Sequence, residues 1–413
     1  MIHPRLEQDA QLGCLEFQPD MSSIHSVILT SALLLAPLLH AAEAPKRATV
    51  PVPLGHDESL RHEVQRAIDR GLDWLLANQN PKGWWTTPDH PALTALPLVA
   101  LNGEPRGRFL TNPPAAIRRG YDFLLASAKP DGGIYATNMA NYNTSLALLA
   151  FVSAGRPEYD AVARKARSFI VGTQVDFGER GRLDTPFDGG VGYGNKYAHS
   201  DLNNTLIAIE ALYHSRRLIA DTKLADTKDL DWQAAIRFLQ HCQNLPGSNP
   251  ESWASADPAQ KGGFVYYPGH SMAGTVTNSA SGRVALRSYG SASYAGLLSY
   301  VYADLKRDDP RVIAVLDWLR LNYTLEENPG MGPQGLYYYL HLLTKGLSAA
   351  QIDRLETKGG GKINWRQEVA LRLMNLQQKD GSWSNDNARW WEKETALTTS
   401  YSLIALETIW RGL

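Results

Sequence analysis

The sequence predicts an all-α protein, an (α/α)6 toroid in which six inner helices surround a central cavity and six outer helices cover them. Two observations lead to this prediction. From Arg61 onward, amphipathic segments alternate with segments that are apolar on all sides, and turns rich in Gly and Trp join them. A helix that is apolar on every side must be buried on every side, so the amphipathic helices must lie outside it.

The amphipathic segments carry basic residues and one apolar anchor each, such as Trp74 in the first and Leu373 in the last. They are expected as outer helices over residues 67–78, 115–126, 161–173, 232–242, 312–321 and 365–376. The segments that are apolar on all sides mostly start on a hydroxyl or amide residue. They are expected as inner helices over residues 92–101, 142–151, 202–212, 291–300, 337–343 and 397–407.

Six helix pairs can also stack as an open solenoid, but a solenoid normally needs polar repeats that cap its two ends. Neither the first nor the last pair is more polar than the others, which favours a closed ring. Three insertions, over residues 175–200, 244–287 and 324–335, interrupt the alternation and are expected to be functional loops. The stretch 262–267 within the second insertion is a candidate short strand.

The N-terminal part of the chain is not expected to belong to this fold. Residues 1–44 are interpreted as an upstream segment followed by a signal peptide, with Met21 as the start and 27–39 as its apolar run, which is too short for an ordinary membrane span. Export to the periplasm or outside the cell follows, with anchoring through 27–39 as the alternative. Residues 45–60 are Pro-rich and are predicted as a linker, which leaves 61–413 as the toroid domain.

The balanced charge, formally −1, argues against nucleic acid or an anionic membrane surface as the main partner. Membrane contact is therefore expected only through the N-terminal apolar run, if it is not cleaved. After signal cleavage Cys242 is the only cysteine, so no internal disulfide is expected and the residue is interpreted as a small buried one.

One turn pattern recurs: a basic residue and Gly, an aromatic anchor with two aliphatic residues, then Gln and Gly-x-Trp. It is nearly complete over residues 70–85, its second half returns over 378–383, and a degraded copy covers 130–135. Gln79 and Gln378 are expected to bind unpaired groups at helix ends, and the tryptophans to act as structural staples over the turns.

This pattern resembles the QW motif of the squalene and oxidosqualene cyclases, within the superfamily of terpenoid cyclases and protein prenyltransferase β-subunits. The resemblance covers roughly residues 61–413 and implies the toroid fold. In squalene–hopene-type cyclases the middle Asp of an Asp-x-Asp-Asp-Thr segment protonates an alkene. The matching segment here begins with Asp201, but the position of the acid is Asn203, and an amide cannot donate that proton. Cyclisation by the family's mechanism is therefore not expected.

The resemblance also implies where a prenyltransferase would hold zinc, with Asp, Cys and His ligands at the starts of inner helices. Asp201 matches the first ligand, Asn203 stands where the Cys would be, and Thr398 and Thr399 offer no His on the last inner helix. His199 and Asp201 with His90 or His270 have only loose metal-ligand spacing. No metal and no cofactor are expected, and whether the chain is an enzyme stays open.

The candidate site is a cavity mouth formed by the N-terminal ends of the inner helices. Asp201 and Glu394 are the candidate catalytic residues, with N-capping and a favourable first-turn charge as their alternative roles. At least one of the tyrosines 337–339 is expected to face the lumen. The candidate ligand-binding residues are Asp89, His90, His199, Asn204, Tyr289, Tyr338, Trp390 and Trp391.

Three functions remain open at this point. The first is an exported protein that binds an apolar, isoprenoid-like ligand and lacks the family's catalytic acid and zinc site. The second is a carbohydrate-active enzyme, a lyase or glycosidase on the same architecture with a saccharide ligand, for which Arg283, Arg287 and the two carboxylates are the candidates. The third is a non-enzymatic scaffold for protein interactions. An aromatic lumen lining favours the first, a charged lining the second, and a lumen filled with side chains the third.

Overall fold

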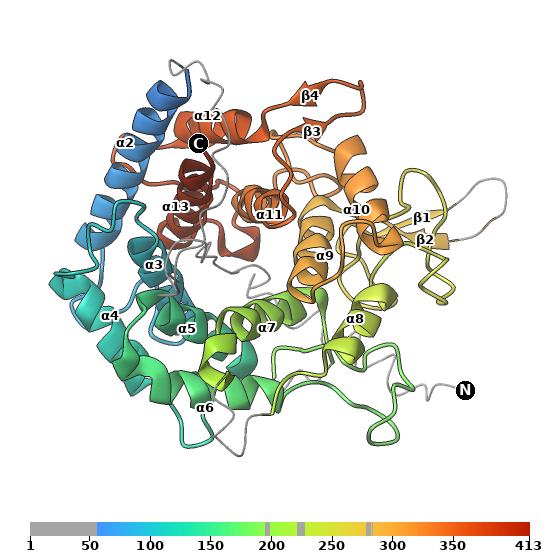
Figure 1. The fold of residues 1–413 in the computed structure, drawn as a ribbon, viewed down its shortest axis with the longest axis horizontal. Helices are drawn as coiled ribbons and strands as arrows, with labels where there is room; N and C mark the ends of the chain where they lie inside the picture. Colours follow the sequence, from blue (N-terminus) through green and yellow to red (C-terminus); the bar gives the residue numbers. More distant parts are fainter. Residues whose placement is uncertain (1–55, 195–198, 221–227, 278–281, 283) are drawn as a thin grey trace, which may run out of the picture.

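The computed structural model describes residues 56–194, 199–220, 228–277, 282 and 284–413. The predicted signal peptide, residues 45–55 of the predicted linker and Arg283 lie outside these residues. Within them, twelve α-helices alternate between two concentric rings, as Figure 1 shows. The (α/α)6 toroid is therefore confirmed. None of the helices in the described part of the chain is long and apolar enough to cross a membrane.

The outer ring consists of the amphipathic helices. Their bounds are α2 His56–Ala77, α4 Ala115–Ala126, α6 Asp160–Val171, α8 Trp232–His241, α10 Pro310–Leu321 and α12 Trp365–Leu376. Two of them, α4 and α12, have the predicted bounds. Helix α2 is longer than expected and begins at His56, so residues 56–60, which the sequence assigned to the linker, belong to the first helix of the toroid.

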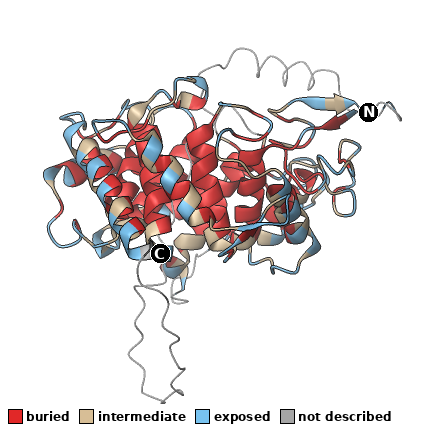
Figure 2. Cartoon of the chain, turned by 90° about the horizontal axis from the view of Figure 1, so that it is seen from above, coloured by how far each residue is buried: buried red, intermediate tan, exposed pale blue. Residues whose placement is uncertain are grey.

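The inner ring consists of helices whose residues are buried along nearly their whole length, coloured red in Figure 2. Their bounds are α3 Ala92–Asn102, α5 Ala140–Ala154, α7 Leu202–His214, α9 Gly290–Tyr302, α11 Leu336–Ala349 and α13 Thr395–Gly412. Each inner helix packs against the next one along the chain, and α13 packs against α3. The last contact closes the ring, so the open solenoid is excluded.

Glutamine side chains connect successive repeats around the outer ring. Gln79 Nε2 donates to the carbonyl of Gly83 in its own turn (2.9 Å) and to that of Ala116 in the next outer helix (2.7 Å). In the described residues the same double contact is made by Gln79, Gln174, Gln243 and Gln377. Near the C-terminus the residue is Gln377 rather than the predicted Gln378, and its second bond, to Ala67 of α2 (2.9 Å), spans the closure of the ring.

Glycines let these turns approach the next outer helix closely. Gly262, for example, has a φ of +92°, and a Cβ on it would lie 2.0 Å from the carbonyl oxygen of Ala314 in α10. Only a residue without a side chain fits so near a backbone in the left-handed region. The same close approach to the following outer helix is shared by Gly83, Gly132, Gly189, Gly262 and Gly381.

The apolar residue two positions after each of these glycines fills the space between the rings. Trp85 and Trp383 are buried, and their indole N–H groups donate to the carbonyls of Leu75 (2.9 Å) and Leu373 (2.8 Å) at the ends of the preceding helices. These contacts agree with the predicted role of the tryptophans as structural staples. Cys242 is buried as well, as expected.

Two small antiparallel hairpins accompany the helices in the described residues. Residues 244–287 carry a hairpin of β1 Thr275–Thr277 and β2 Val284–Leu286. The predicted strand at 262–267 contains only isolated bridges, from Phe264 to Gln243 and from Tyr267 to His270. A second small hairpin, β3 Leu355–Glu356 with β4 Lys362–Ile363, precedes α12.

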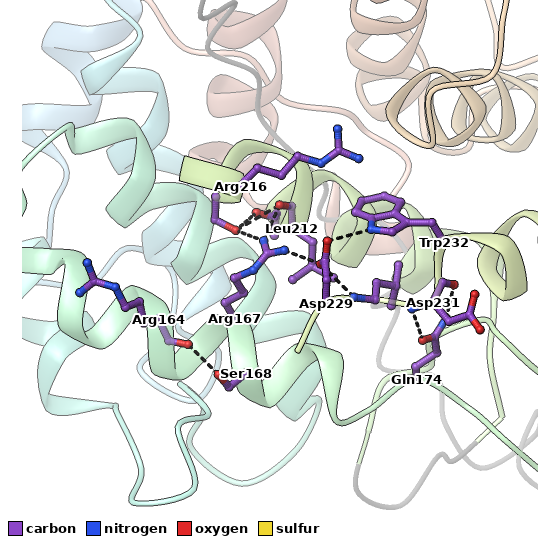
Figure 3. Close-up of polar contacts among 12 residues, drawn as sticks. Arg164, Arg167, Ser168, Gln174, Leu212, Arg216, Asp229, Asp231 and Trp232 are labelled. Carbon is purple, nitrogen blue, oxygen red and sulfur yellow. Dashed lines mark hydrogen bonds and ion pairs between the residues drawn. The ribbon is translucent and has the colours of Figure 1, made fainter. Parts of the chain in front are cut away.

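A buried arginine fastens the segment before α8 to the rings. Arg167 on α6 donates to the carbonyl of Leu212, near the C-terminal end of α7 (2.5 Å), and forms an ion pair with Asp229, as Figure 3 shows. A cation is favoured at this end of a helix because the helix dipole is negative there. The Gln174 contact with Asp231 lies beside it.

Candidate functional site

The N-terminal ends of several inner helices meet around a small cavity with a free volume of about 10 Å3. That is room for about one water molecule. Aromatic, apolar, hydroxyl and amide side chains form its wall, and the lining in the described residues contains no charged side chain. The lining residues are Asn203, Tyr266, Met272, Tyr289, Ser291, Tyr338 and Trp390.

Each helix places its contribution through its first turn. Asn203 is the second residue of α7, Ser291 the second residue of α9, and Tyr338 the third residue of α11. Tyr289 is the N-cap residue of α9, and Trp390 lies in the short 3-10 helix Arg389–Trp391 that precedes α13. The cavity therefore lies at the mouth of the toroid, where the sequence predicted a site.

Asp201 lies close to this mouth but does not line the cavity. It is fully buried as the N-cap of α7, and its two carboxylate oxygens accept from the backbone N–H (2.9 Å) and the side-chain amide (2.7 Å) of Asn204. Burial raises the pKa of Asp201 to about 6, and the two hydrogen bonds from Asn204 oppose this rise. Asp201 thus has the N-capping role, and Asn204 is the residue that holds it.

Tyrosines surround Asp201 on the side of the cavity. Burial, and secondarily the charge of Asp201, raises the pKa of both Tyr266 and Tyr289 well above the ordinary value. The hydroxyl of Tyr266 donates to that of Tyr193 (3.4 Å). The wall is therefore a set of neutral phenols, with one buried carboxyl group behind them.

The loop before α13 carries two tryptophans, Trp390 and Trp391. Trp390 and Trp391 both have left-handed backbones, with φ of +62° and +63°, which is uncommon for large side chains. The loop is held by the buried carboxylate of Glu392, which accepts from the N–H of Tyr338 in α11 (2.8 Å) and from the amide of Asn385 (2.6 Å). Burial raises the pKa of Glu392 to about 7.

Below the cavity the lumen is crossed by side chains from helices that are not neighbours in the ring. The hydroxyl of Tyr338 on α11 donates to Asn203 Oδ1 on α7 (3.4 Å). Deeper along the same two helices, Lys345 and Glu210 form a fully buried ion pair (2.6 Å), and burial lowers the pKa of Lys345 to about 8. The lumen of the described residues is thus filled at this level.

His90 and Trp391 meet at the rim of the mouth. Their rings pack edge to face with centroids 5.6 Å apart, both are half-buried, and burial lowers the pKa of His90. Asp89 is exposed and accepts from the hydroxyl of Thr87 (3.2 Å); the N-cap of α3 is Pro91, so Asp89 does not cap that helix. None of the three lines the cavity.

His199 lies in a cluster of rings formed by the insertions. It packs on Tyr267, with centroids 4.9 Å apart, and the ring of His270 stacks on the same tyrosine at 4.8 Å. Burial is the main cause that lowers the pKa of His270. In the part of the chain that the structure describes, no three His, Cys, Asp or Glu side chains are grouped so as to hold a metal ion.

The remaining charged candidates are not part of the cavity wall. Glu394 is the N-cap residue of α13; its side chain makes no capping bond and the residue is half-buried. Arg287 is exposed, after the hairpin of the second insertion. Tyr289, Tyr338 and Trp390 are therefore the predicted residues that line the cavity.

Four lining residues were not predicted as ligand-binding. Asn203 stands at the position of the missing acid, and its place in the first turn of α7 is the sequence signal that puts it at the mouth. Ser291 begins an inner helix in the same way. Tyr266 and Met272 come from the second insertion, whose path no local pattern in the sequence indicates.

No family model and no curated protein matches the sequence. Among solved structures, the apo form of a variant of the type II terpene cyclase MstE from Scytonema is similar, with a TM-score of 0.50 and 14% identity over 86% of this chain and 99% of that one. At this identity the similarity establishes the fold alone. The chain thus has an α/α toroid fold, which it shares with this terpene cyclase.

Carbohydrate-active toroids are also similar to this chain. A family 76 glycoside hydrolase from a bovine Bacteroides thetaiotaomicron strain has a TM-score of 0.49 and 9% identity, over 83% of this chain and 77% of that one. A glycosidase in complex with glucose has a TM-score of 0.47 and 14% identity, over 87% of this chain and 99% of that one.

Proposed function

We propose that the protein binds an apolar, isoprenoid-like ligand at the mouth of the toroid, and that it does not act as a proton-donating cyclase. The observation that carries this proposal is the aromatic, uncharged lining of the cavity, in which Asn203 faces the space. Aromatic and apolar side chains with a few placed polar groups are the usual lining of small-molecule sites in proteins. An amide is no acid, and the buried Asp201 has both oxygens occupied by Asn204.

The cavity is much smaller than an isoprenoid, so only one end of the ligand enters it. The rest would lie against the half-buried side chains at the rim, Met272, Trp391 and His90. A saccharide-cleaving enzyme is less well supported. Such an enzyme needs carboxylate or basic groups in its cleft, and Asp201 and Glu394 do not line the cavity.

Native mass spectrometry of the protein purified from its own host, followed by lipid extraction, tests this proposal. An isoprenoid-like species that co-purifies, and that raises the melting temperature of the stripped protein when added back, is the expected result. A protein that carries no lipid, and that only oligosaccharides stabilise, would overturn it.

A scaffold for protein interactions is the second candidate, because Tyr338 and the pair Lys345–Glu210 cross the lumen. Under this alternative the long insertions are the contact surfaces. No isoprenoid or saccharide would then change the melting temperature, and deleting residues 244–287 would remove partner binding without a ligand phenotype.

We further propose export, on the apolar run 27–39 and the small residues that follow it. The mass of the mature chain from its host would show cleavage near Ala44. A full-length chain in the membrane fraction would support the alternative of an N-terminal anchor.

A further inference from the structure

Three side chains that line the cavity keep unused hydrogen-bonding capacity. Asn203 accepts from Tyr338 through Oδ1, and its Nδ2 has no partner among the described residues. The hydroxyl of Tyr289 likewise has none in this part of the chain. Ser291 Oγ accepts from Asn328 (3.1 Å), and its own proton is donated to no described residue.

The residues that carry these donors are almost completely buried. The exposed fractions of the three residues are 6% for Asn203, 3% for Tyr289 and 2% for Ser291, and all three side chains reach the same cavity. Buried polar groups normally have a partner, since an unsatisfied one is costly. Three donors around one space point to a hydrogen-bond acceptor as its occupant.

The size of the cavity limits this acceptor. A free volume of about 10 Å3 suits one oxygen atom and not a carboxylate, phosphate or sugar ring. The N-terminal ends of α7 and α9, which supply Asn203 and Ser291, also favour an electron-rich atom, because the helix dipole is positive there.

The surrounding charges disfavour an anion. The carboxyl group of Asp201 lies behind Tyr266 and Tyr289, where it contributes to the raised pKa of both. Arg389, a cation at the mouth, is exposed and places its guanidinium over the ring of Trp390, 5.3 Å from the centroid. Lys345, the buried cation deeper in the lumen, is already paired with Glu210, so among the described residues an anion in the cavity would lack a free buried cation as its partner.

We propose that the cavity binds the single oxygen of an uncharged alcohol or carbonyl end of the ligand, and that Asn203, Tyr289 and Ser291 are its donors. This inference rests on the proposed function. It specifies the chemical class of the ligand end that enters the cavity. It also makes Asn203 the residue that discriminates an oxygenated ligand from a hydrocarbon.

The test compares phytol with phytane, which share one branched C20 skeleton and differ mainly in the hydroxyl group, by quenching of tryptophan fluorescence in the full-length protein. We expect phytol to bind about fivefold to tenfold more tightly. Phytanate, the anion of the same skeleton, should bind more weakly than phytol.

The variant Asn203→Leu should bind phytol and phytane with about the same affinity, and its affinity for phytane should not be lower than that of the wild-type protein. Tyr289→Phe removes one oxygen, keeps the ring and should reduce the preference for phytol over phytane severalfold. This second variant keeps the test valid if Asn203→Leu does not fold. Tyr135→Phe, at a half-buried tyrosine that does not line the cavity, is the matched control and should leave the preference unchanged.

Equal affinities for phytol and phytane in the wild-type protein would overturn the inference and leave the proposed function standing. A preference that persists in both variants, or tighter binding of phytanate, would also overturn it. Absence of binding by all three probes would overturn the inference together with the proposed function.

Discussion

Asp201 combines full burial with a structural task, and this combination has a consequence for stability. Its pKa is raised from an ordinary 3.8 to about 6 because burial penalises the charged form. Between these two values the folded protein holds a proton that the unfolded chain has already lost. The contribution of Asp201 to stability must therefore fall as the pH rises from about 4 to about 6, by up to about 3 kcal/mol.

The variant Asp201→Asn should lose this pH dependence. Asparagine is also a good N-cap, and a flipped Asn204 amide can accept from it through Oδ1, which is buried without a partner among the described residues. We expect the free energy of unfolding of the variant, relative to wild type, to improve by roughly 3 kcal/mol between pH 4 and pH 7.

Urea unfolding at the two pH values measures this change, and the comparison with wild type cancels other groups such as Glu392. Asp201→Ala is the control: it loses the same titration but also the cap, so it should be about 1 kcal/mol less stable than Asp201→Asn at both pH values. A variant-to-wild-type difference that stays constant from pH 4 to pH 7 would show that the pKa of Asp201 is not raised.

At the scale of elements, each turn between an outer and an inner helix packs on the next outer helix. Gly262→Ala should therefore be severely destabilising, by about 3 kcal/mol or more, since its Cβ would overlap the backbone of α10 at Ala314. Gly155→Ala is the matched control. Gly155 also has a positive φ, +63°, but no atom lies within 4 Å of the added Cβ, so only about 1 kcal/mol is expected.

Denaturant unfolding of the two variants separates close packing from backbone strain. Equal losses of unfolding free energy in the two variants would mean that the turn at Gly262 does not pack closely against α10.

The loop that carries Trp390 and Trp391 is followed by two glutamates, Glu392 and Glu394. Only Glu392 is expected to hold the loop in place. Glu392→Ala removes the acceptor for the N–H of Tyr338 and for the amide of Asn385, both in a buried position, so we expect a loss of about 2–4 kcal/mol. Glu394→Ala should change stability by less than about 0.5 kcal/mol, because its side chain makes no capping bond. Thermal melting of both variants checks this, and similar losses for the two would contradict the role given to Glu392.

The alternation of amphipathic and fully apolar segments was sufficient to predict the ring from the sequence, because burial on all sides leaves few other arrangements. The turns were harder to recognise. Those after Gln174 and Gln243 were missed because Val191 and Phe264 occupy the position of the tryptophan; any apolar residue of sufficient size fills that space. The sequence pattern pointed to Gln378 as the residue that bonds a helix end, whereas Gln377 has this role. Only the fold determines which of the two side chains reaches α2.

The site was predictable to the extent that it depends on the first turns of inner helices, as Tyr289 and Tyr338 do. It was not predictable where separate insertions converge. Tyr266 reaches the cavity only because the second insertion returns to the mouth, and Glu392 is buried only because its loop folds over α11.

At the scale of the whole molecule, closure removes the ends that a linear array of repeats would have. Helices α3 and α13 are far apart in sequence but pack on each other, and the outer ring is closed where Arg70 of α2 donates to the carbonyls of Gln378 (2.7 Å) and Lys379 (2.9 Å). The first and last repeats should therefore be as stable as the middle ones, whereas the terminal repeats of a solenoid open first.

Hydrogen exchange of the native protein tests this expectation directly. Buried amides of α3 and α13 should exchange as slowly as those of α7 and α9, because opening either terminal helix breaks the ring on both sides. In the variant Gln377→Ala, which loses the bonds to Ala67 and Gly381, exchange should accelerate in α2 and α12 before it does in α6 and α8. The internal counterpart Gln174→Ala should reverse that order. Faster exchange at α3 and α13 already in the wild-type protein would mean that the closing contact contributes little and that the repeats behave as an open array.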